Sequence, residues 1–514
     1  MGGPTAFGKK GVITVQQLTG LDSLFLYGEA GTTPMHIAPL LIYDAVDSKE
    51  GRAPIEAIRR VFLERLDRSP IFRRKLVSVP LNLDHPYWID DQNFNLDAHV
   101  RHIALPKPGT WRQFCGQLAR LHAEPLDRSR PLWEAYVIEG LDDVEGLAKG
   151  SFALFIKVHH AAADGAGSVE ILQAIHDLQA KPRARKLAVK PPSSTKAGHS
   201  ESVPAATKLL SFAVRNSLRS PLRLARVARR SLGSTVKGVL ENDKKKPDPE
   251  LEVPRTRFSD TVSTQRSFGA VSMGASQLQK IRTLVDGATA NDVVLAIVAG
   301  GLRRYLQEKG ELPEESLVSG VPANMRGRAA GSGGGNEVSV MRVTLATDLK
   351  APRDRLQAIA AATTRAKEDL ASRGESIMSD IGESIPPLVA SLGVRAITEA
   401  GLIARARPVF NTIVSNIPGA KGDHYLAGAR LVRSLGAAPC WDSMGLFHTV
   451  SSYDTQFAIS FQACRDMLPD PDFYEECLEA AYRELCDLVT TGRRRHKAKQ
   501  STRRSSKRYA RKAA

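Results

Sequence analysis

The sequence predicts an α/β protein with two folded regions joined by a basic linker. Its 514 residues are about three times the usual domain size, so more than one domain is expected. In both halves of the chain, short apolar runs rich in strand-forming residues alternate with stretches of helical periodicity. The segment between the halves is rich in Pro, Lys and Ser, which is typical of a linker. Together these observations indicate α/β layering in both folded regions.

The linker also contains a segment with the pattern of a basic amphipathic helix. Leu210, Val214 and Leu218 recur at helical spacing among Arg and Lys. Such a helix can lie in a membrane interface or pack its apolar stripe on a domain. We divide the chain into an N-terminal extension (1–17), a first α/β domain (18–183), the basic linker with its helix (184–258), a second α/β domain (259–490) and a disordered basic tail (491–514).

Composition and charge exclude several classes of protein. The formal net charge is +17, and the chain from Arg493 onward carries no acidic residue. Such a tail can bind anionic lipid headgroups or nucleic acid, or it can be a solvated tail with no dedicated partner. Nucleic acid is not expected as a partner, because the basic stretches lack interleaved aromatic residues. No apolar run is long enough to span a bilayer and no secretory signal is evident, so we expect a cytoplasmic protein. The five cysteines lack metal-ligand or disulfide-framework spacing.

A paired-histidine segment, HHAAADG, lies between a predicted strand and a predicted helix. The apolar run from Phe152 to Val158 favours a strand, and Ser168 to Ala180 has helical periodicity. The segment between them therefore occupies a strand-to-helix loop. Two histidines at a strand end are often satisfied core residues. Four fixed positions in one short loop make chance less plausible and favour a functional site.

The chemistry of these four residues suits proton transfer. Adjacent side chains on a strand face opposite ways, so only one of His159 and His160 is expected to point into a given cleft. An imidazole can accept a proton from a hydroxyl and later donate it to a leaving group. Asp164 can hold a ring tautomer or anchor the loop, and Gly165 permits backbone geometry that a side chain would block.

HHAAADG matches the HHxxxDG signature of the CoA-dependent acyltransferase superfamily. Several further blocks resemble the wax ester synthase/diacylglycerol acyltransferase family in particular. The resemblance extends roughly from Leu18 to Leu488, without the central basic stretch and the tail. These blocks are LTGLDSLFLYGEAGTTPMHIAPLLIYD near the start, the PLW element at Pro131, Leu132 and Trp133, the ND element at Asn291 and Asp292, and the later VPANMR, GNEVSVMRV and NTIVSNIPGA. A series of blocks in the expected order is far more specific than any single motif.

The resemblance implies two tandem chloramphenicol-acetyltransferase-like domains with mixed sheets and an active site at their interface. It implies that His160 is the general base, that His159 belongs to the scaffold and that Asp164 and Gly165 support the loop. Asn291 would donate a hydrogen bond to the developing oxyanion, although Asn291 or Asp292 as a helix cap explains the same residues. The segment Pro131, Leu132 and Trp133 would shape the core or the acyl channel.

The implied activity is transfer of a long-chain acyl group from acyl-CoA to diacylglycerol, to a long-chain alcohol, or to both. No metal and no resident cofactor are expected, and the protein would attach peripherally to the inner face of the cell membrane or to lipid inclusions. Two alternatives remain open at this point. One is a condensation-type acyl or peptidyl transferase, although no carrier or adenylation region is present. The other is a non-catalytic lipid-droplet or membrane coat, which has no need of a paired-histidine loop.

Overall fold

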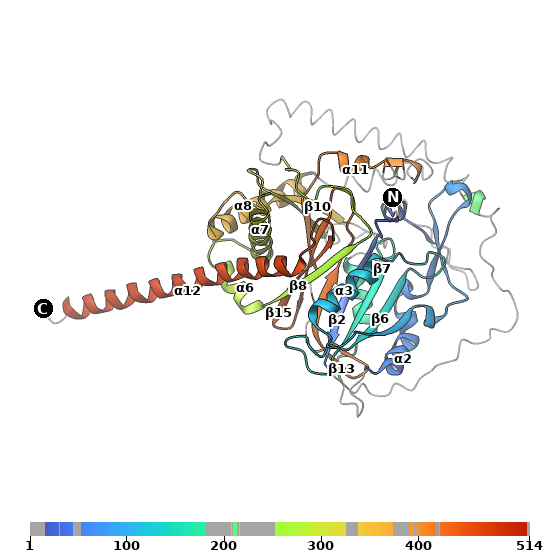
Figure 1. Cartoon of the computed structure of the whole chain (residues 1–514), viewed down its shortest axis with the longest axis horizontal. Coiled ribbons are helices and arrows are strands. Elements are labelled where there is room, and N and C mark those ends of the chain that lie inside the picture. Colours follow the sequence, from blue (N-terminus) through green and yellow to red (C-terminus); the bar gives the residue numbers. More distant parts are fainter. Residues whose placement is uncertain are drawn as a thin grey trace.

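Two six-stranded mixed sheets stand next to each other in the computed structural model, with helices packed on them (Figure 1). This arrangement confirms the predicted α/β class with two sheet-rich units. The structure describes residues 16–29, 31–44, 53–163, 165–180, 207, 209–212, 215, 252–324, 338–373, 391–394, 396–397, 400–417, 419 and 422–510.

The first sheet has the strand order β12, β13, β2, β7, β6, β5, and all neighbours are antiparallel except β5 and β6. Its strands are β2 (His36–Tyr43), β5 (Val100–Ala104), β6 (Trp133–Glu139), β7 (Phe152–His159), β12 (Tyr425–Leu426) and β13 (Ala429–Ala437). The helices of this unit are α2 (Ile55–Arg65), α3 (Trp111–Ala123) and α4 (Gly165–Ile175). All eight residues of β7 are buried. A strand covered on both faces reads as a continuous apolar run, which explains why the sequence predicted it.

The second sheet has the order β10, β9, β11, β14, β15, β8, with β11 parallel to both of its neighbours. Its strands are β8 (Arg266–Gly274), β9 (Val318–Asn324), β10 (Val338–Thr344), β11 (Thr412–Ile417), β14 (Leu446–Tyr453) and β15 (Gln456–Cys464). The helices of this unit are α6 (Ala275–Arg282), α7 (Ala290–Glu308), α8 (Pro352–Arg373), α11 (Leu402–Arg405) and α12 (Pro471–Ala510).

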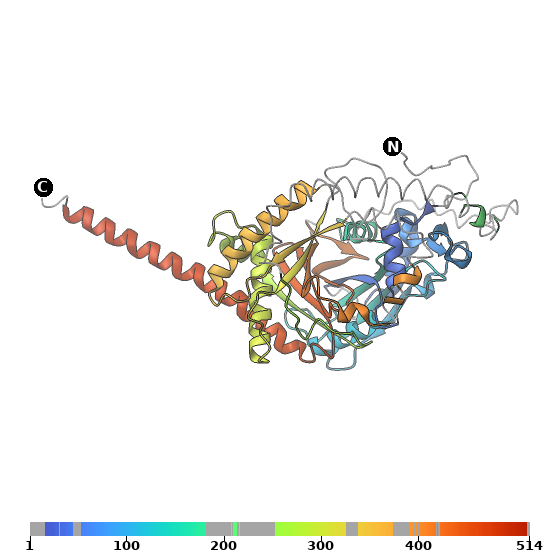
Figure 2. The same ribbon diagram turned by 90° about the horizontal axis from the view of Figure 1, so that it is seen from above.

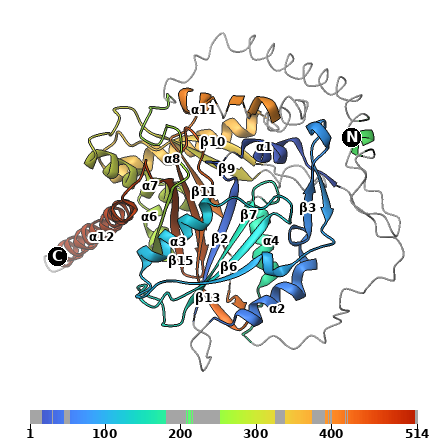
Figure 3. The ribbon, with the colours of Figure 1, turned by 45° about the vertical axis from the view of Figure 1, so that its right-hand side comes forward.

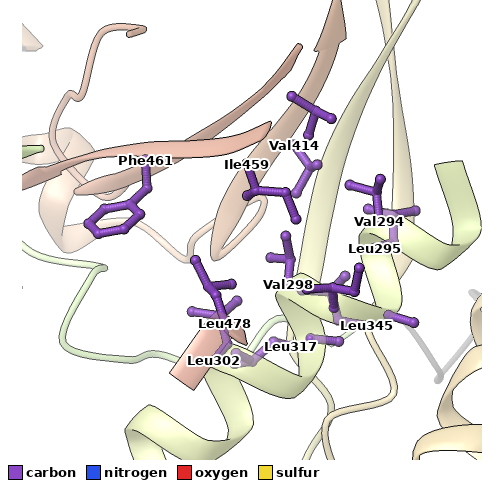
Figure 4. Close-up of a cluster of buried hydrophobic side chains, with 14 of the residues drawn as sticks. Val294, Leu295, Val298, Leu302, Leu317, Leu345, Val414, Ile459, Phe461 and Leu478 are labelled. Atoms are coloured by element: carbon purple, nitrogen blue, oxygen red, sulfur yellow. The ribbon is translucent and has the colours of Figure 1, made fainter. Parts of the chain in front are cut away.

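Helix α7 forms the centre of the second unit's core (Figure 4). Val294 and Val298 of α7 pack in one buried cluster with Ile459 of β15, and each is at most 2% exposed. Helix α12 approaches α7 closely, because a Cβ added at Gly301 would lie 2.7 Å from the side chain of Leu478. The glycine therefore sets the spacing between the two helices.

The two units are joined because a later part of the chain adds strands to the first sheet. β13 comes from the later part of the chain but pairs with β2 in the first sheet, with Ala437 opposite Ala38. One buried apolar cluster then combines Phe155 of β7 with Phe268 of β8 and Ala458 of β15. The two sheets therefore share a buried core, and the later part of the chain supplies β12 and β13 to the first sheet.

A small third sheet and helix α1 border one end of the first sheet (Figure 3). The sheet consists of β1 (Gln16–Gln17), β4 (Tyr87–Asp90) and β3 (Arg74–Val77), and α1 is Gly20–Gly28. The first unit also contains four short 3-10 helices, which are η1 (Leu66–Arg68), η2 (Pro70–Phe72), η3 (Pro80–Asn82) and η4 (Leu96–Ala98). Leu26 of α1 packs in one cluster with Leu132 and Ala161, and with Leu76 and Trp88 of the small sheet. Helix α1 is thereby fixed against the turn that follows β7.

The described part of the amphipathic segment packs on the first unit. Leu209 is buried with Val79 and Tyr87, and the Phe212 ring lies 5.9 Å from that of Tyr87. Of the two possibilities for this amphipathic segment, a membrane interface or packing on a domain, these residues show packing on a domain. Most of the predicted linker, 184–206 and 216–251, lies outside the described residues.

The prediction of a disordered tail from residue 491 is wrong for most of its length. Helix α12 continues to Ala510 and projects from the rest of the protein (Figure 2). Beyond Gly492 the segment contains no Pro or Gly and is rich in Arg, Lys and Ala, which all favour helix. Helix propensity, together with continuation from a packed helix, prevails although this part is too polar to form a core. Among the described residues, no helix is both long and apolar enough to cross a membrane.

A half-buried carboxyl group on α12 links the two units. Oε1 of Glu475 accepts hydrogen bonds from the Ala270 N–H at 2.7 Å and from Nε1–H of Trp111 on α3 at 3.0 Å. Burial, aided by the negative charges of Asp472 and Glu479, raises the pKa of Glu475 from 4.5 to about 7 against the effect of these hydrogen bonds. The group should therefore make stability depend on pH.

We expect Glu475→Gln to stabilise the protein at about pH 8 and to leave its stability unchanged at about pH 4. Between pH 4.5 and 7 the unfolded carboxyl loses its proton while the folded one keeps it, so stability falls as pH rises through this window. The cost above this window is at most about 3 kcal/mol. The amide keeps the Oε1 acceptor without the charge. Thermal unfolding at both pH values tests this, and an equal change in Tm at both would contradict it.

Candidate active site

The paired histidines lie where β7 ends and a tight turn begins. The N–H of His159 donates to the carbonyl of Leu132 at 3.0 Å, and the N–H of His160 donates to the carbonyl of Met35 at 2.8 Å. Helix α4 begins at Gly165, so the predicted strand, loop and helix are all present, although the helix ends at Ile175 rather than Ala180. Asp164 lies outside the described residues.

His160 is half-buried and stacks on an aromatic ring. The centroids of the His160 and Phe25 rings are 4.0 Å apart, with an angle of 15° between the planes. Phe25 is on α1, whose N-terminus is capped by the hydroxyl of Thr19 accepting the N–H of Asp22 at 3.1 Å. The stacked ring limits the directions in which the His160 imidazole can point.

His159 is fully buried, in contrast to its neighbour. Its Nδ1 accepts a hydrogen bond from the N–H of Ala161 at 3.0 Å, and its Nε2 lies 3.5 Å from Oε2 of Glu29. The ring therefore interacts with protein groups on both of its nitrogens, which suits a residue that holds the turn.

Glu29 contacts the histidine turn and is not among the site residues identified from the sequence. Its Oε2 accepts a hydrogen bond from Nε of Arg128 at 2.8 Å, and its Oε1 accepts the N–H of Met35 at 3.2 Å. Burial alone would raise the pKa of Glu29, but His159 and Arg128 outweigh burial and hold it at about 2. The only hint in the sequence is that Glu29 lies within the N-terminal block of the resemblance.

The second unit reaches the same segment of the chain. Arg266 of β8 donates a hydrogen bond to the carbonyl of Thr32, between Glu29 and Met35. The loop that contacts both histidines is thus held from the second sheet as well as from the first.

The PLW element lies in the core. Trp133 is 1% exposed, stacks on Phe62 and donates its Nε1–H to the carbonyl of Phe72 at 3.1 Å. Leu132 is fully buried, and its carbonyl accepts the N–H of His159. Pro131 precedes them and its carbonyl accepts the N–H of Trp133 at 2.8 Å. The PLW element is therefore part of the core of the first unit, and Leu132 joins it to the histidine turn.

The ND element lies at the N-terminus of α7. The N-cap is Thr289, not Asn291 or Asp292 as the sequence suggested; Asp292 occupies the third helical position and completes a capping box with Thr289. The other carboxylate oxygen of Asp292 accepts the hydroxyl of Thr363 on α8 at 2.7 Å. Asp292 is 1% exposed, so its contacts join two helices of the second unit. Asn291 is half-buried on the first turn of α7.

Two family models match the sequence. The family model of the wax ester synthase/diacylglycerol acyltransferase catalytic domain matches residues 18–294, and the model of the C-terminal domain of the same family matches residues 334–486. The chain belongs to this family. The first model includes the histidine turn and the PLW and ND elements, and the two models together include every strand of the second sheet except β9.

Mycobacterial proteins are among the relatives that align with this chain. A Mycobacterium tuberculosis protein named as a diacylglycerol O-acyltransferase is 31% identical over 483 residues, covering 92% of each chain. A Mycobacterium bovis protein with the same kind of name is 30% identical over 488 residues, covering 91% of this chain and 98% of that one. Both mycobacterial relatives therefore align with more than nine-tenths of this chain.

Solved structures agree with the predicted fold. The wax ester synthase/diacylglycerol acyltransferase of Marinobacter aquaeolei VT8 matches with a TM-score of 0.64 at 24% identity, covering 92% of this chain and 100% of that one. The first condensation domain of the calcium-dependent antibiotic synthetase matches with a TM-score of 0.54 at 15% identity, covering 93% and 97%. The expected tandem acyltransferase fold is confirmed, and the condensation domain shares that fold alone.

Proposed function

We propose that this protein transfers a long-chain acyl group from acyl-CoA to the hydroxyl of diacylglycerol, of a long-chain alcohol, or of both, with His160 as the general base. The observation that carries the proposal is an intact HHAAADG loop at the end of β7, with His160 half-buried on the turn and stacked on Phe25. Membership of the family, and relatives named as diacylglycerol O-acyltransferases, support the choice of acceptor.

The reaction as proposed is a direct transfer. His160 takes the proton of the acceptor hydroxyl while the oxygen attacks the thioester carbonyl, forming the C–O bond and a tetrahedral oxyanion. The oxyanion collapses, the C–S bond breaks, and His160 returns the proton to the CoA thiolate. The products are the ester and free CoA, and no acyl-enzyme, metal or resident cofactor takes part.

Release of CoA thiol from palmitoyl-CoA tests the proposal, with diacylglycerol and hexadecanol as alternative acceptors. Acceptor-dependent thiol release together with formation of the matching ester is the expected result, and the ratio of the two rates identifies the preferred acceptor. Thiol release without either ester would point to a thioesterase. The absence of any release would reject the acyltransferase assignment.

We also propose that the protein attaches peripherally to an anionic membrane surface or to lipid inclusions. The acceptors are insoluble, and the chain from Thr491 to the end carries no acidic residue. Co-sedimentation with liposomes containing anionic lipid is expected for the full chain and weaker after deletion of residues 205–240 and 493–514. Equal sedimentation of both forms would reject this attachment.

A further inference from the structure

The buried Glu29 carboxylate acts on the turn after β7 through the ring of His159. Because Nδ1 of His159 accepts the N–H of Ala161, the neutral ring must carry its proton on Nε2, the atom that faces Glu29. A carboxylate opposite Nε2 stabilises this tautomer. The His159 carbonyl in turn accepts the N–H of Ala162 at 2.8 Å. The ring and backbone of His159 thus hold the turn in which His160 lies.

A second route joins the same carboxylate to the backbone of His160. Oε1 of Glu29 accepts the N–H of Met35, and the carbonyl of Met35 accepts the N–H of His160. Met35 precedes β2, which pairs with β7 so that His36 lies opposite His159. Glu29 therefore contacts the last residue of β7 and the residue that precedes β2.

Arg128 extends this network to the helix that carries the stacked ring. It donates to the Glu29 carboxylate and also to the carbonyl of Leu26 on α1 at 2.9 Å. The same helix carries Phe25, which stacks on His160. One ion pair consequently fixes α1 and the turn after β7 relative to each other.

We infer that Glu29, held by Arg128, is a positioning residue that orients the His160 imidazole through His159 and Met35. This inference rests on the proposed function, since it assumes that His160 is the general base. Glu29 does not exchange a proton with the substrate. A reacting group misplaced by about 1 Å can cost about 100-fold in rate, so loss of the carboxylate should affect turnover more than substrate binding.

Glu29→Gln is the test, because the amide has the same shape but cannot pair with Arg128 as an anion. We expect kcat to fall about 100-fold, with KM for acyl-CoA changed by no more than about twofold. Glu29→Asp keeps the charge on a shorter side chain and should recover part of kcat. If Glu29 only fills space, the shorter Glu29→Asp should not recover kcat relative to Glu29→Gln.

A matched control is available in another buried ion pair. Asp177 pairs with Arg65 at 2.6 Å beyond the C-terminus of α4, and neither side chain is more than 20% exposed. Asp177→Asn should lower the thermal stability and leave kcat unchanged. Loss of turnover in Glu29→Gln without such loss in Asp177→Asn separates positioning from general destabilisation.

A spectroscopic readout does not depend on turnover. ¹⁵N spectra of histidine-labelled protein should show His159 as the Nε2–H tautomer in the wild type and a changed tautomer population in Glu29→Gln. An unchanged His159 signal, or an active Glu29→Gln with wild-type kcat, overturns the inference. If Glu29→Gln does not fold, Glu29→Asp and Arg128→Lys decide: lowered kcat at unchanged KM supports positioning, and wild-type kcat in both rejects it. If the wild type transfers no acyl group but the His159 tautomer population still differs between the wild type and Glu29→Gln, only the proposed function is rejected.

Discussion

Replacing His160 with alanine is expected to lower kcat for acyl transfer by about 10²- to 10⁴-fold, the range that general acid–base catalysis supplies. Without the imidazole no group at this position takes the proton from the attacking hydroxyl, and none returns it to the CoA thiolate. The change should appear in acceptor-dependent thiol release at saturating acyl-CoA. The fold should survive, because His160 is half-buried and its backbone contact with Met35 does not need the ring.

A surface histidine of the same unit provides the comparison for this variant. His102 on β5 has a side chain 40% exposed and lies 3.1 Å from Glu139. His102→Ala should retain wild-type kcat. Equal activity of His160→Ala and His102→Ala would remove His160 from the reaction, whereas loss in both would indicate a general effect of the substitutions on the first unit.

Local patterns in the sequence were sufficient for the elements that carry the histidines. The apolar run ending at Val158 predicted β7, because a strand buried on both faces appears in the sequence as a continuous run of apolar residues. The turn and helix followed from HHAAADG and the periodicity after it. The crossing of β13 into the first sheet was not foreseen, because strand partners nearly 400 residues apart leave no local pattern.

The surroundings of the histidines were less accessible to prediction than the histidines themselves. Glu29 meets His159 across 130 residues of sequence, and nothing within its own segment distinguishes it from a solvated glutamate. The helix cap at Thr289 was misplaced because Asn and Asp are also favoured caps, and only the backbone shows which residue begins the helix. The basic part of α12 was misjudged because the absence of a core was taken to mean the absence of helix.

Trp133→Ala is expected to lower the free energy of unfolding by about 3–5 kcal/mol, the usual cost of truncating a large buried aromatic residue. The Trp133 ring stacks on Phe62 with centroids 5.5 Å apart and meets the edge of Phe72 at 5.1 Å. Truncation would leave a cavity between α2 and the first sheet and would also leave the Phe72 carbonyl without its donor. Chemical denaturation of the purified variant at neutral pH measures the loss.

Trp133→Phe separates the two contributions, because it keeps an aromatic ring and removes only the Nε1–H donor and part of the volume. It should cost much less than the alanine variant, about 1–2 kcal/mol, if packing is the main role of the PLW element. Under conditions where Trp133→Phe is folded, kcat should match the wild type. A folded Trp133→Phe with wild-type stability and strongly reduced kcat would instead place Trp133 in direct contact with the substrate. The buried position of its ring among Phe62, Phe72 and His99 argues against that outcome.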